Sequence, residues 1–458
     1  MSASPAGIWQ SRNVWVTGGA VALIFLGALE SLAVTTVMPV VAEDLGGTAL
    51  YAVAFSGTFA ASVIGMVAAG AWCDRRSPLG ALATAVGLFV LGLLVAGLAG
   101  DMAVLVVGRL LQGLGAGGQT VALYVVIARV YPASQHGRVF AAFAAAWVIP
   151  SLIGPVLAGA VAEFLHWRWV FLGVAVLTVI AFALVWMRIR TMALATEHPE
   201  RSAVGSRLGW AVLVAVAALA LSLAPEAGAW MPVIVIAAIA VIAVGIRPLV
   251  PRGTLRAERG LPSVVLMRGM IAGSLFGAEV YLPYLLIAEY GLSPVWAGAG
   301  LTAAAVLWAT GSAVQGRWGD ALGSTRIAVV GVSLLAIATA IATATAAWHL
   351  APAVVVVGWA LAGAGMGLMY PRLAVLTLSY STAQNQGFNS SALSISDSVG
   401  AATVTALLGV AFSAVGGGVA AFTTVFALAT VVGVAALVPG LRLDRGARSD
   451  VGFEVDSR

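Results

Sequence analysis

Lysine is absent from the sequence, and all 23 basic residues are arginine. A phosphate-binding loop of the Walker type and a Schiff base with pyridoxal phosphate or retinal both need a lysine, so these chemistries are excluded. The single cysteine, Cys73, excludes an internal disulfide, and the four histidines are scattered without metal-ligand spacing. We therefore expect no metal, no cofactor and no energy supply from ATP through a Walker motif.

Charge of either sign is scarce. Only 9% of the 458 residues are charged and 61% are hydrophobic, with a mean hydropathy of +1.04, whereas about a quarter of the residues of a soluble domain are charged. The apolar runs are continuous and do not alternate with polar residues, which excludes an outer-membrane barrel. The composition predicts an all-α polytopic membrane protein and not an enzyme. The first apolar run is longer than the h-region of a secretory signal, so we expect no cleavable signal peptide.

A transmembrane helix needs about 20 apolar residues, and the sequence predicts fourteen such spans, arranged as six, two and six. The predicted spans are 14–38, 50–72, 79–99, 102–124, 138–160, 168–187, then 208–224 and 230–249, then 264–288, 295–316, 326–347, 352–373, 387–413 and 417–440. We expect an N-terminal half over 1–190, linkers with two extra helices over 191–262, a C-terminal half over 263–440 and a tail over 441–458. Because 208–224 is short, the alternative is one re-entrant hairpin over 208–249 and twelve spans.

The loop charges predict the orientation. With the N-terminus in the cytoplasm, every arginine except Arg109 and Arg168 falls at or near the cytoplasmic side. The predicted outer loops carry acids instead. This asymmetry is the positive-inside pattern, so both termini are expected inside. Since the arginines are dispersed over short loops, we expect a lipid bilayer and no nucleic acid as the partner of this basic chain.

Among the charged residues inside the apolar runs, four are the functional candidates: Glu30, Arg109, Glu279 and Asp397. A charge in hydrocarbon is costly, so such residues are functional candidates by default. Burial disfavours the charged form of a carboxylic acid, so Glu30 and Glu279 are candidate proton carriers. The alternatives are a structural hydrogen bond or the binding of a cationic substrate. Arg109 needs an acid or a carbonyl as partner, and Glu30 is the candidate; Asp397, among serines, either lines the cavity or joins helices.

Other candidates are uncharged. Gln112, one helical turn after Arg109, is expected to supply hydrogen bonds. Trp147, Tyr281 and Tyr284 lie well within their spans, whereas aromatic residues at span ends are more often interface anchors. We therefore expect Gln112 and these three aromatic side chains to line an apolar central cavity and to bind the substrate.

A short motif occurs twice, at matching positions of the two halves. Gly70-Ala-Trp-Cys-Asp74-Arg75 follows the second span, and Gly316-Arg-Trp-Gly-Asp320 follows the second span of the other half. This doubled motif resembles the cytoplasmic loop motif of the major facilitator superfamily, whose two halves are parallel repeats. The acid Asp74 is predicted to latch onto a helix N-terminus of the opposite half, with Arg138 as salt-bridge partner.

Two further motifs support the resemblance. Arg109-Leu-Leu-Gln112-Gly113 is similar to a motif whose buried arginine is thought to assist proton transfer in drug exporters. The segment with Gly154, Pro155 and Gly159 is similar to a glycine- and proline-rich motif of antiporters, where it seals or bends the fifth helix. The spacing from Glu30 to Pro39 resembles the fourteen-span drug:proton antiporters, although that group usually has Asp at the first position. These matches cover essentially the whole chain.

The resemblance implies a major facilitator fold and a proton-coupled exporter of lipophilic or amphipathic compounds that works by alternating access. Its partners would be the substrate, protons and the bilayer of a bacterial cytoplasmic (inner) membrane, with the proton gradient in place of a cofactor and the monomer as working unit. A lipid or glycolipid exporter of the same fold is the alternative. A sensor or assembly factor that transports nothing is a third hypothesis, which the costly buried charges oppose.

Overall fold

The computed structural model describes residues 14–131, 133–190, 204–382 and 385–444, and over these ranges the regular secondary structure is helical. The long helices are α1 (Val14–Asp44), α2 (Tyr51–Cys73), α3 (Pro78–Gly97), α4 (Met102–Val130), α5 (Ala133–Phe164), α6 (Arg168–Ile189), α7 (Val204–Ser222), α8 (Met231–Gly245), α9 (Leu261–Ala288), α10 (Pro294–Leu322), α11 (Ser324–Trp348), α12 (Pro352–Ser379), α13 (Gln386–Val415) and α14 (Gly418–Ala435). Short helical segments are η1 (Thr48–Leu50), η2 (Ala224–Trp230), η3 (Thr254–Arg256) and α15 (Leu437–Gly440).

Each predicted span coincides with a helix. Thirteen helices of the described ranges are long and apolar enough to cross a membrane, and the apolar part of α7, Arg207–Ser222, is shorter. The predicted all-α fold is therefore confirmed. The segment with the alternative prediction forms two helices, α7 and α8, that pack against each other through a break at η2, where Gly228 has a φ of 54°. We call α7, η2 and α8 the hairpin.

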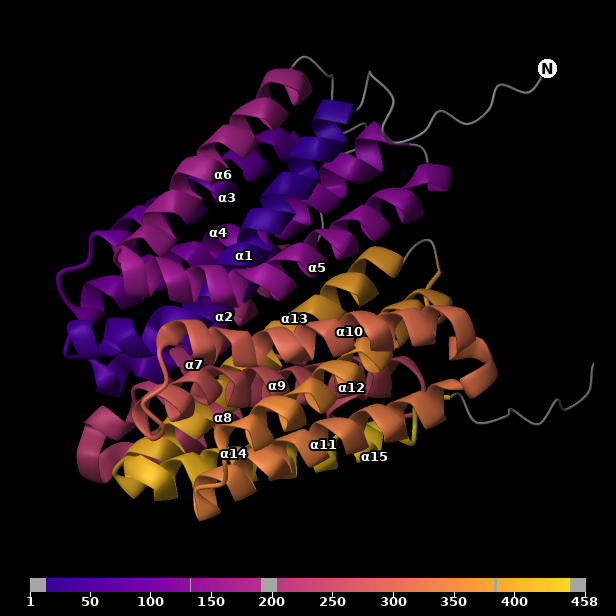
Figure 1. Cartoon of the computed structure of the whole chain (residues 1–458). Coiled ribbons are helices and arrows are strands. Elements are labelled where there is room, and N and C mark those ends of the chain that lie inside the picture. Colours follow the sequence, from indigo (N-terminus) through magenta and orange to yellow (C-terminus); the bar gives the residue numbers. More distant parts are fainter. Residues whose placement is uncertain (1–13, 132, 191–203, 383–384, 445–458) are drawn as a thin grey trace, which may run out of the picture.

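Helices α1–α6 form one bundle and α9–α14 a second, lying side by side in Figure 1. Within each bundle, two helices approach closely at glycines spaced four residues apart. Side chains at Gly113 and Gly117 of α4 would collide with the backbone of α2, and side chains at Gly363 and Gly367 of α12 would collide with the backbone of α10. Small residues at this spacing allow membrane helices to pack closely, where packing and not hydrophobicity drives association.

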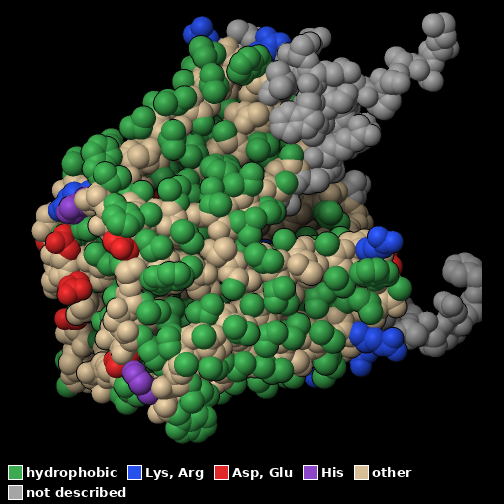
Figure 2. All heavy atoms as spheres, viewed as in Figure 1, with side chains coloured by type: hydrophobic (Ala, Val, Ile, Leu, Met, Phe, Trp, Pro, Cys, Tyr) green, Lys and Arg blue, Asp and Glu red, His purple; other side chains and the backbone are tan. Residues whose placement is uncertain are grey.

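The two ends of the molecule differ in charge. In Figure 2 the acidic side chains gather at one end, and arginines at the opposite end. The end with Glu43, Asp101, Glu163 and Glu226 is called the acidic end, and the other the arginine-rich end. This separation agrees with the predicted orientation, in which the arginine-rich end is cytoplasmic.

The halves are in contact near the acidic end. The Tyr51 hydroxyl of α2 donates to the Val280 carbonyl of α9 over 2.7 Å, and α5 packs on α10 where a side chain at Gly159 would lie 2.5 Å from the Pro294 carbonyl oxygen. Toward the arginine-rich end, Figure 2 shows a hollow between the two bundles. The structure therefore holds the halves closed at one end and apart at the other.

Candidate functional site

A buried ion pair joins α1 to α4. The Arg109 Nη1 donates to a carboxylate oxygen of Glu30, and the two residues are only 4% and 5% exposed. The same nitrogen donates to Gln112 Oε1 over 2.6 Å, and Arg109 Nε donates to the Ala54 carbonyl over 3.3 Å. The structure thus gives Arg109 the partner proposed from the sequence. Because the charges compensate each other, this part of the interior carries no net charge.

Gln112 is held at one side only. Its carbonyl oxygen accepts from Arg109, whereas its Nε2 has no hydrogen-bond partner in the described part of the chain. The residue is 1% exposed. A buried donor without a partner costs about 1–3 kcal/mol, so this nitrogen is poised to donate to a water molecule or a substrate beside the ion pair.

A second ion pair lies in the C-terminal half. Arg268 Nε of α9 donates to Asp397 Oδ1 of α13 over 2.7 Å, and the Tyr370 hydroxyl of α12 donates to the same oxygen over 2.8 Å. The guanidinium lies 3.3 Å above the centre of the Tyr370 ring. These three side chains connect three helices of one half. Asp397, like Glu30, is therefore compensated.

The pairing of Arg268 with Asp397 was not predicted from the sequence. Arg268 was expected at or near the cytoplasmic side with the other arginines, but it lies inside α9, seven positions after Leu261. The serines around Asp397 have other partners, since Ser396 donates to the Val265 carbonyl and Ser398 accepts from Ser62. The available signal was an arginine inside the apolar run 264–288, which needs a carboxylate or carbonyl partner.

Glu279 differs from the two paired acids. It is half-buried in α9, and it forms no ion pair and no hydrogen bond with the residues that the structure describes. It lies eleven residues after Arg268, which places both on the same face of the helix, about 16 Å apart along the axis. One face of α9 thus carries a paired arginine and, nearer the acidic end, an uncompensated acid.

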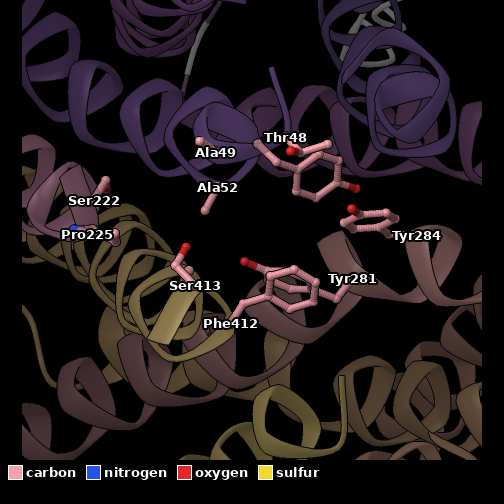
Figure 3. Close-up of a pocket in the computed structure, with 11 residues that line it drawn as sticks. Thr48, Ala49, Ala52, Ser222, Pro225, Tyr281, Tyr284, Phe412 and Ser413 are labelled. Atoms are coloured by element: carbon pink, nitrogen blue, oxygen red, sulfur yellow. The ribbon is translucent and has the colours of Figure 1, made fainter. Parts of the chain in front are cut away.

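Tyr281 and Tyr284 do not line a central cavity. They lie at the acidic end with Tyr51 of α2 and Phe412 of α13, with ring centroids of Tyr51 and Tyr284 4.9 Å apart and of Tyr281 and Phe412 5.2 Å apart. Figure 3 shows them at one side of a small pocket whose other side is formed by Ser222 and Pro225 of the hairpin. The register of α9 thus places these rings beyond Glu279, where the halves meet, and their predicted contact with substrate stays a prediction.

Trp147 belongs to a different environment. It lies on α5 and is 48% exposed. The exposed side chains Val148, Ile149 and Ile153 accompany it on the same helix. The structure therefore does not bring Trp147 together with the two tyrosines, and its predicted contact with substrate stays a prediction.

The structure describes an ion-pair partner for one of the two predicted latch acids, Asp74 and Asp320. Asp74 and Arg75 are exposed at the end of α2, and the side chain of Arg138 lies outside the described residues, so the proposed Asp74–Arg138 bridge stays a prediction. In the second copy, Asp320 forms an ion pair with Arg372 of α12, with Nη1 and Oδ1 2.6 Å apart. This partner belongs to the same half as Asp320. Gly316 faces open space.

The Gly154-Pro155-Gly159 segment contributes to the contact between the halves. A side chain at Gly298 of α10 would collide with the Pro155 carbonyl, as one at Gly159 would with the Pro294 carbonyl. Thr302 of α10 also donates to the Leu152 carbonyl over 3.2 Å. This segment of α5 is therefore a direct backbone-to-backbone contact with α10 near the acidic end.

The described residues contain no group of three or more His, Cys, Asp or Glu side chains that could hold a metal ion. In the interior of the described helices, the geometry contains two compensated ion pairs, one in each half, and the uncompensated carboxylic acid Glu279. Two six-helix bundles closed at one end and hollow at the other define the class of a secondary membrane transporter, in which binding at the interior alternates between the two sides.

The chain belongs to the Major Facilitator Superfamily, whose family model matches residues 20–278. This is a family of transporters and not of enzymes. The prediction of the superfamily is confirmed, and membership of the narrower fourteen-span drug:proton antiporter group stays a prediction.

Individual relatives match part of the chain. The MFS-type efflux pump LUC4 of Fusarium sp is 32% identical over 170 residues, which cover 36% of this chain and 30% of that protein. Efflux pump FUS6 of Gibberella moniliformis is 32% identical over 165 residues, covering 35% and 29%. The matched part of the chain therefore spans less than a third of the length of these curated relatives.

Solved structures match over nearly the whole chain. A POT family transporter in complex with 5-aminolevulinic acid has a TM-score of 0.69 at 12% identity, over 94% of this chain and 96% of that chain. A bacterial homolog of the human lysosomal transporter Spinster, in an inward-facing and unoccupied conformation, has a TM-score of 0.65 at 13% identity, over 94% and 95%. At this level of identity the likeness establishes the fold alone.

Proposed function

We propose that the protein is a proton-coupled exporter, an antiporter of lipophilic or amphipathic compounds that works by alternating access. The observation that carries this proposal is the contrast among the three interior acids. Glu30 and Asp397 are each compensated by an arginine, whereas Glu279 has no ion-pair partner among the described residues. A half-buried acid without a partner inside a membrane helix is favoured in its neutral, protonated form, so we assign to Glu279 the gain and loss of a proton.

Proton movement and conformation are coupled through this charge. When Glu279 is ionised it requires water or a cationic group of the substrate, and when it is protonated it tolerates the apolar contact between the halves. A proton that enters from the acidic end and neutralises Glu279 would favour closure of that end. The protein would then return to the conformation that is hollow at the arginine-rich end. Substrate entering from that hollow would then compete with the proton. Exchange of proton for substrate requires that the two compete for one site.

Three observations support export. The segment around Gly154, Pro155 and Gly159 resembles an antiporter motif and forms the contact between α5 and α10. The relatives LUC4 and FUS6 carry the name efflux pump. In the expected orientation the hollow of Figure 2 faces the cytoplasm, the side from which an exporter loads. We propose the cytoplasmic membrane of a bacterium as its location, because the sequence motifs resemble those of drug:proton antiporters.

The test is transport by purified protein in lipid vesicles with an imposed pH gradient, against a panel of lipophilic dyes, lipids and glycolipids. Wild type is expected to move at least one dye against its gradient. Glu279→Gln should abolish gradient-driven transport but retain counterflow, which moves substrate without net protons. Substrate binding to wild type should depend on pH, and this dependence should disappear in Glu279→Gln.

A matched control lies on the same helix. Glu289→Gln removes an acid at the acidic end of α9 and should leave both gradient-driven transport and counterflow intact. If Glu279→Gln transports at the wild-type rate with an unchanged pH profile, the coupling proposal fails. If the vesicles move lipids or glycolipids and no dye, the fold and coupling stand and the cargo is the alternative class.

A further inference from the structure

The hairpin lies across the boundary between the halves. Helix α7 packs against α2 of the N-terminal half and against α13 of the C-terminal half, and α8 packs against α7 on the far side. Most of α8 is exposed or half-buried, and only Ala238, Ile242 and Gly245 are buried. In a membrane this face of α8 would lie in lipid, so α7 stands between the lipid and the seam of α2 with α13.

The contact of α7 with α2 is interlocked. The hydroxyl oxygens of Ser56 in α2 and Ser222 in α7 are 2.6 Å apart, and both residues are buried. The Leu219 side chain fills a notch at Gly57, where a Cβ would lie 3.1 Å from Leu219 Cδ2. The buried positions Ala211, Ala215, Ala218 and Ser222 recur every three or four residues along α7. A face of small residues lets two helices approach and pack closely.

The contact with α13 is looser. At the acidic end the pocket of Figure 3 separates hairpin residues Ser222 and Pro225 from α13 residues Phe412 and Ser413, and residues of η1, α2 and α9 also line it. At the arginine-rich end, Arg207 lies over the Phe388 ring of α13 at 4.9 Å from its centroid. A cation over an aromatic face interacts through the ring's quadrupole, so the guanidinium can shift across the ring without a specific hydrogen bond being broken.

We propose that the hairpin is a lateral seal carried by the N-terminal half: it stays fixed to α2 through the transport cycle and slides over α13, so that the α2–α13 seam stays closed to lipid in both conformations. The physical reason is the difference between the two faces of α7. Separation from α2 would expose a buried hydroxyl pair to hydrocarbon and empty the Gly57 notch, whereas displacement along α13 changes a pocket and a cation–aromatic contact. The seal leaves the α5–α10 seam as the lateral route for lipophilic compounds.

Two serine pairs on one helix offer a matched test. Ser56 contacts Ser222 of α7 at 2.6 Å, and six residues further along α2, Ser62 contacts Ser398 of α13 at 3.2 Å. Cysteine pairs at both places have side chains close enough for a disulfide. The double variants S56C/S222C and S62C/S398C are made with Cys73→Ala, so that each protein has one pair of thiols. Reduced and oxidised forms of the same preparation are compared, which separates cross-linking from misfolding.

The expected results are opposite for the two pairs. The oxidised S56C/S222C protein should transport within about twofold of its reduced form, because the hairpin and α2 move together. The oxidised S62C/S398C protein should lose at least about 90% of transport, because this disulfide ties the halves. A loss of transport on oxidation of S56C/S222C overturns the proposal, as does full activity of oxidised S62C/S398C, which would mean that α2 never separates from α13.

A distance measurement gives the same answer without a transported compound. Spin labels at the exposed positions Val216 of α7, Leu91 of α3 and Val357 of α12 report on the hairpin and the two halves. Upon a pH shift that changes the Leu91–Val357 distance, the Val216–Leu91 distance should stay constant and the Val216–Val357 distance should change. The reverse pattern would assign the hairpin to the C-terminal half and overturn the proposal.

Discussion

The carboxylate of Glu30 and the guanidinium of Arg109 form an ion pair in the interior of the N-terminal half, linking α1 and α4. Its counterpart in the C-terminal half is the pair of Arg268 with Asp397, whereas Glu279, in the first helix of that half, stands without such a partner. The halves are thus similar in helix arrangement and different in charge. On this difference rests our proposal of a structural role for the two pairs and of proton exchange for Glu279.

The Glu30–Arg109 pair should behave as a unit in stability. Arg109→Gln leaves a buried carboxylate without its cation, and removing one partner of a buried pair costs about 3–5 kcal/mol. The double variant E30Q/R109Q has no unpaired charge and should recover most of that loss. Thermal unfolding of wild type, Glu30→Gln, Arg109→Gln and the double variant in detergent forms a double-mutant cycle. This cycle measures the coupling free energy between the two charges. Additive losses from the two single variants would show that the charges do not interact.

Tyr370 separates two contributions to the Arg268–Asp397 cluster. Tyr370→Phe keeps the ring below the guanidinium but removes the hydroxyl that donates to Asp397, with an expected loss of about 1.5–3 kcal/mol for a hydrogen bond to a charged group. Tyr370→Leu also removes the cation–aromatic contact and should cost a further 0.5–2 kcal/mol, roughly. Denaturant or thermal unfolding provides the values. Equal stability of the Phe and Leu variants would contradict the contribution of the ring.

Gly159 should be intolerant of any side chain because of its position against Pro294. Gly159→Val forces α5 away from α10 at the acidic end, so it should open this end and lower gradient-driven transport by at least about tenfold. Thiol labelling of a cysteine placed at Ala52, added from the acidic side, should become faster. Gly173→Val on α6 is the control, because a Cβ at that position would have no neighbouring atom within 4 Å. Unchanged labelling in Gly159→Val would argue against the contact as a closure of this end.

The two loop acids should differ in effect. Asp320 is 98% exposed in its contact with Arg372, and a surface ion pair contributes about 0–1 kcal/mol, so Asp320→Asn should change stability little. Asp74→Asn should cut transport strongly while expression and substrate affinity stay near wild type, since a latch acts on the conformational equilibrium. Transport assays and equilibrium binding on the same preparations check both. If Asp74→Asn instead removes substrate binding and leaves the conformational equilibrium unchanged, the latch hypothesis is wrong.

The sequence by itself determined the class, the spans and the candidate charges. Span length follows from the thickness of the bilayer, and each apolar run satisfies that requirement within its own residues. Glu30, Arg109, Glu279 and Asp397 were identifiable because a charge inside an apolar run is costly wherever the helix lies. The partner of Arg109 could be named from the sequence because few acids lay at a comparable depth in the same half.

Only the tertiary structure decided which groups meet. Three outcomes depend on how α9, α10, α12 and α13 are rotated about their axes. Arg268 pairs with Asp397, Arg372 pairs with Asp320, and Glu279 has no ion-pair partner within the described residues. A rotation of 100° per residue moves a side chain from the interior to the lipid, and hydrophobicity on all sides of a membrane helix leaves no polar face to indicate it. For the same reason the positions of Tyr281 and Tyr284 at the acidic end, and the two unequal faces of α7, became visible only in the packed structure.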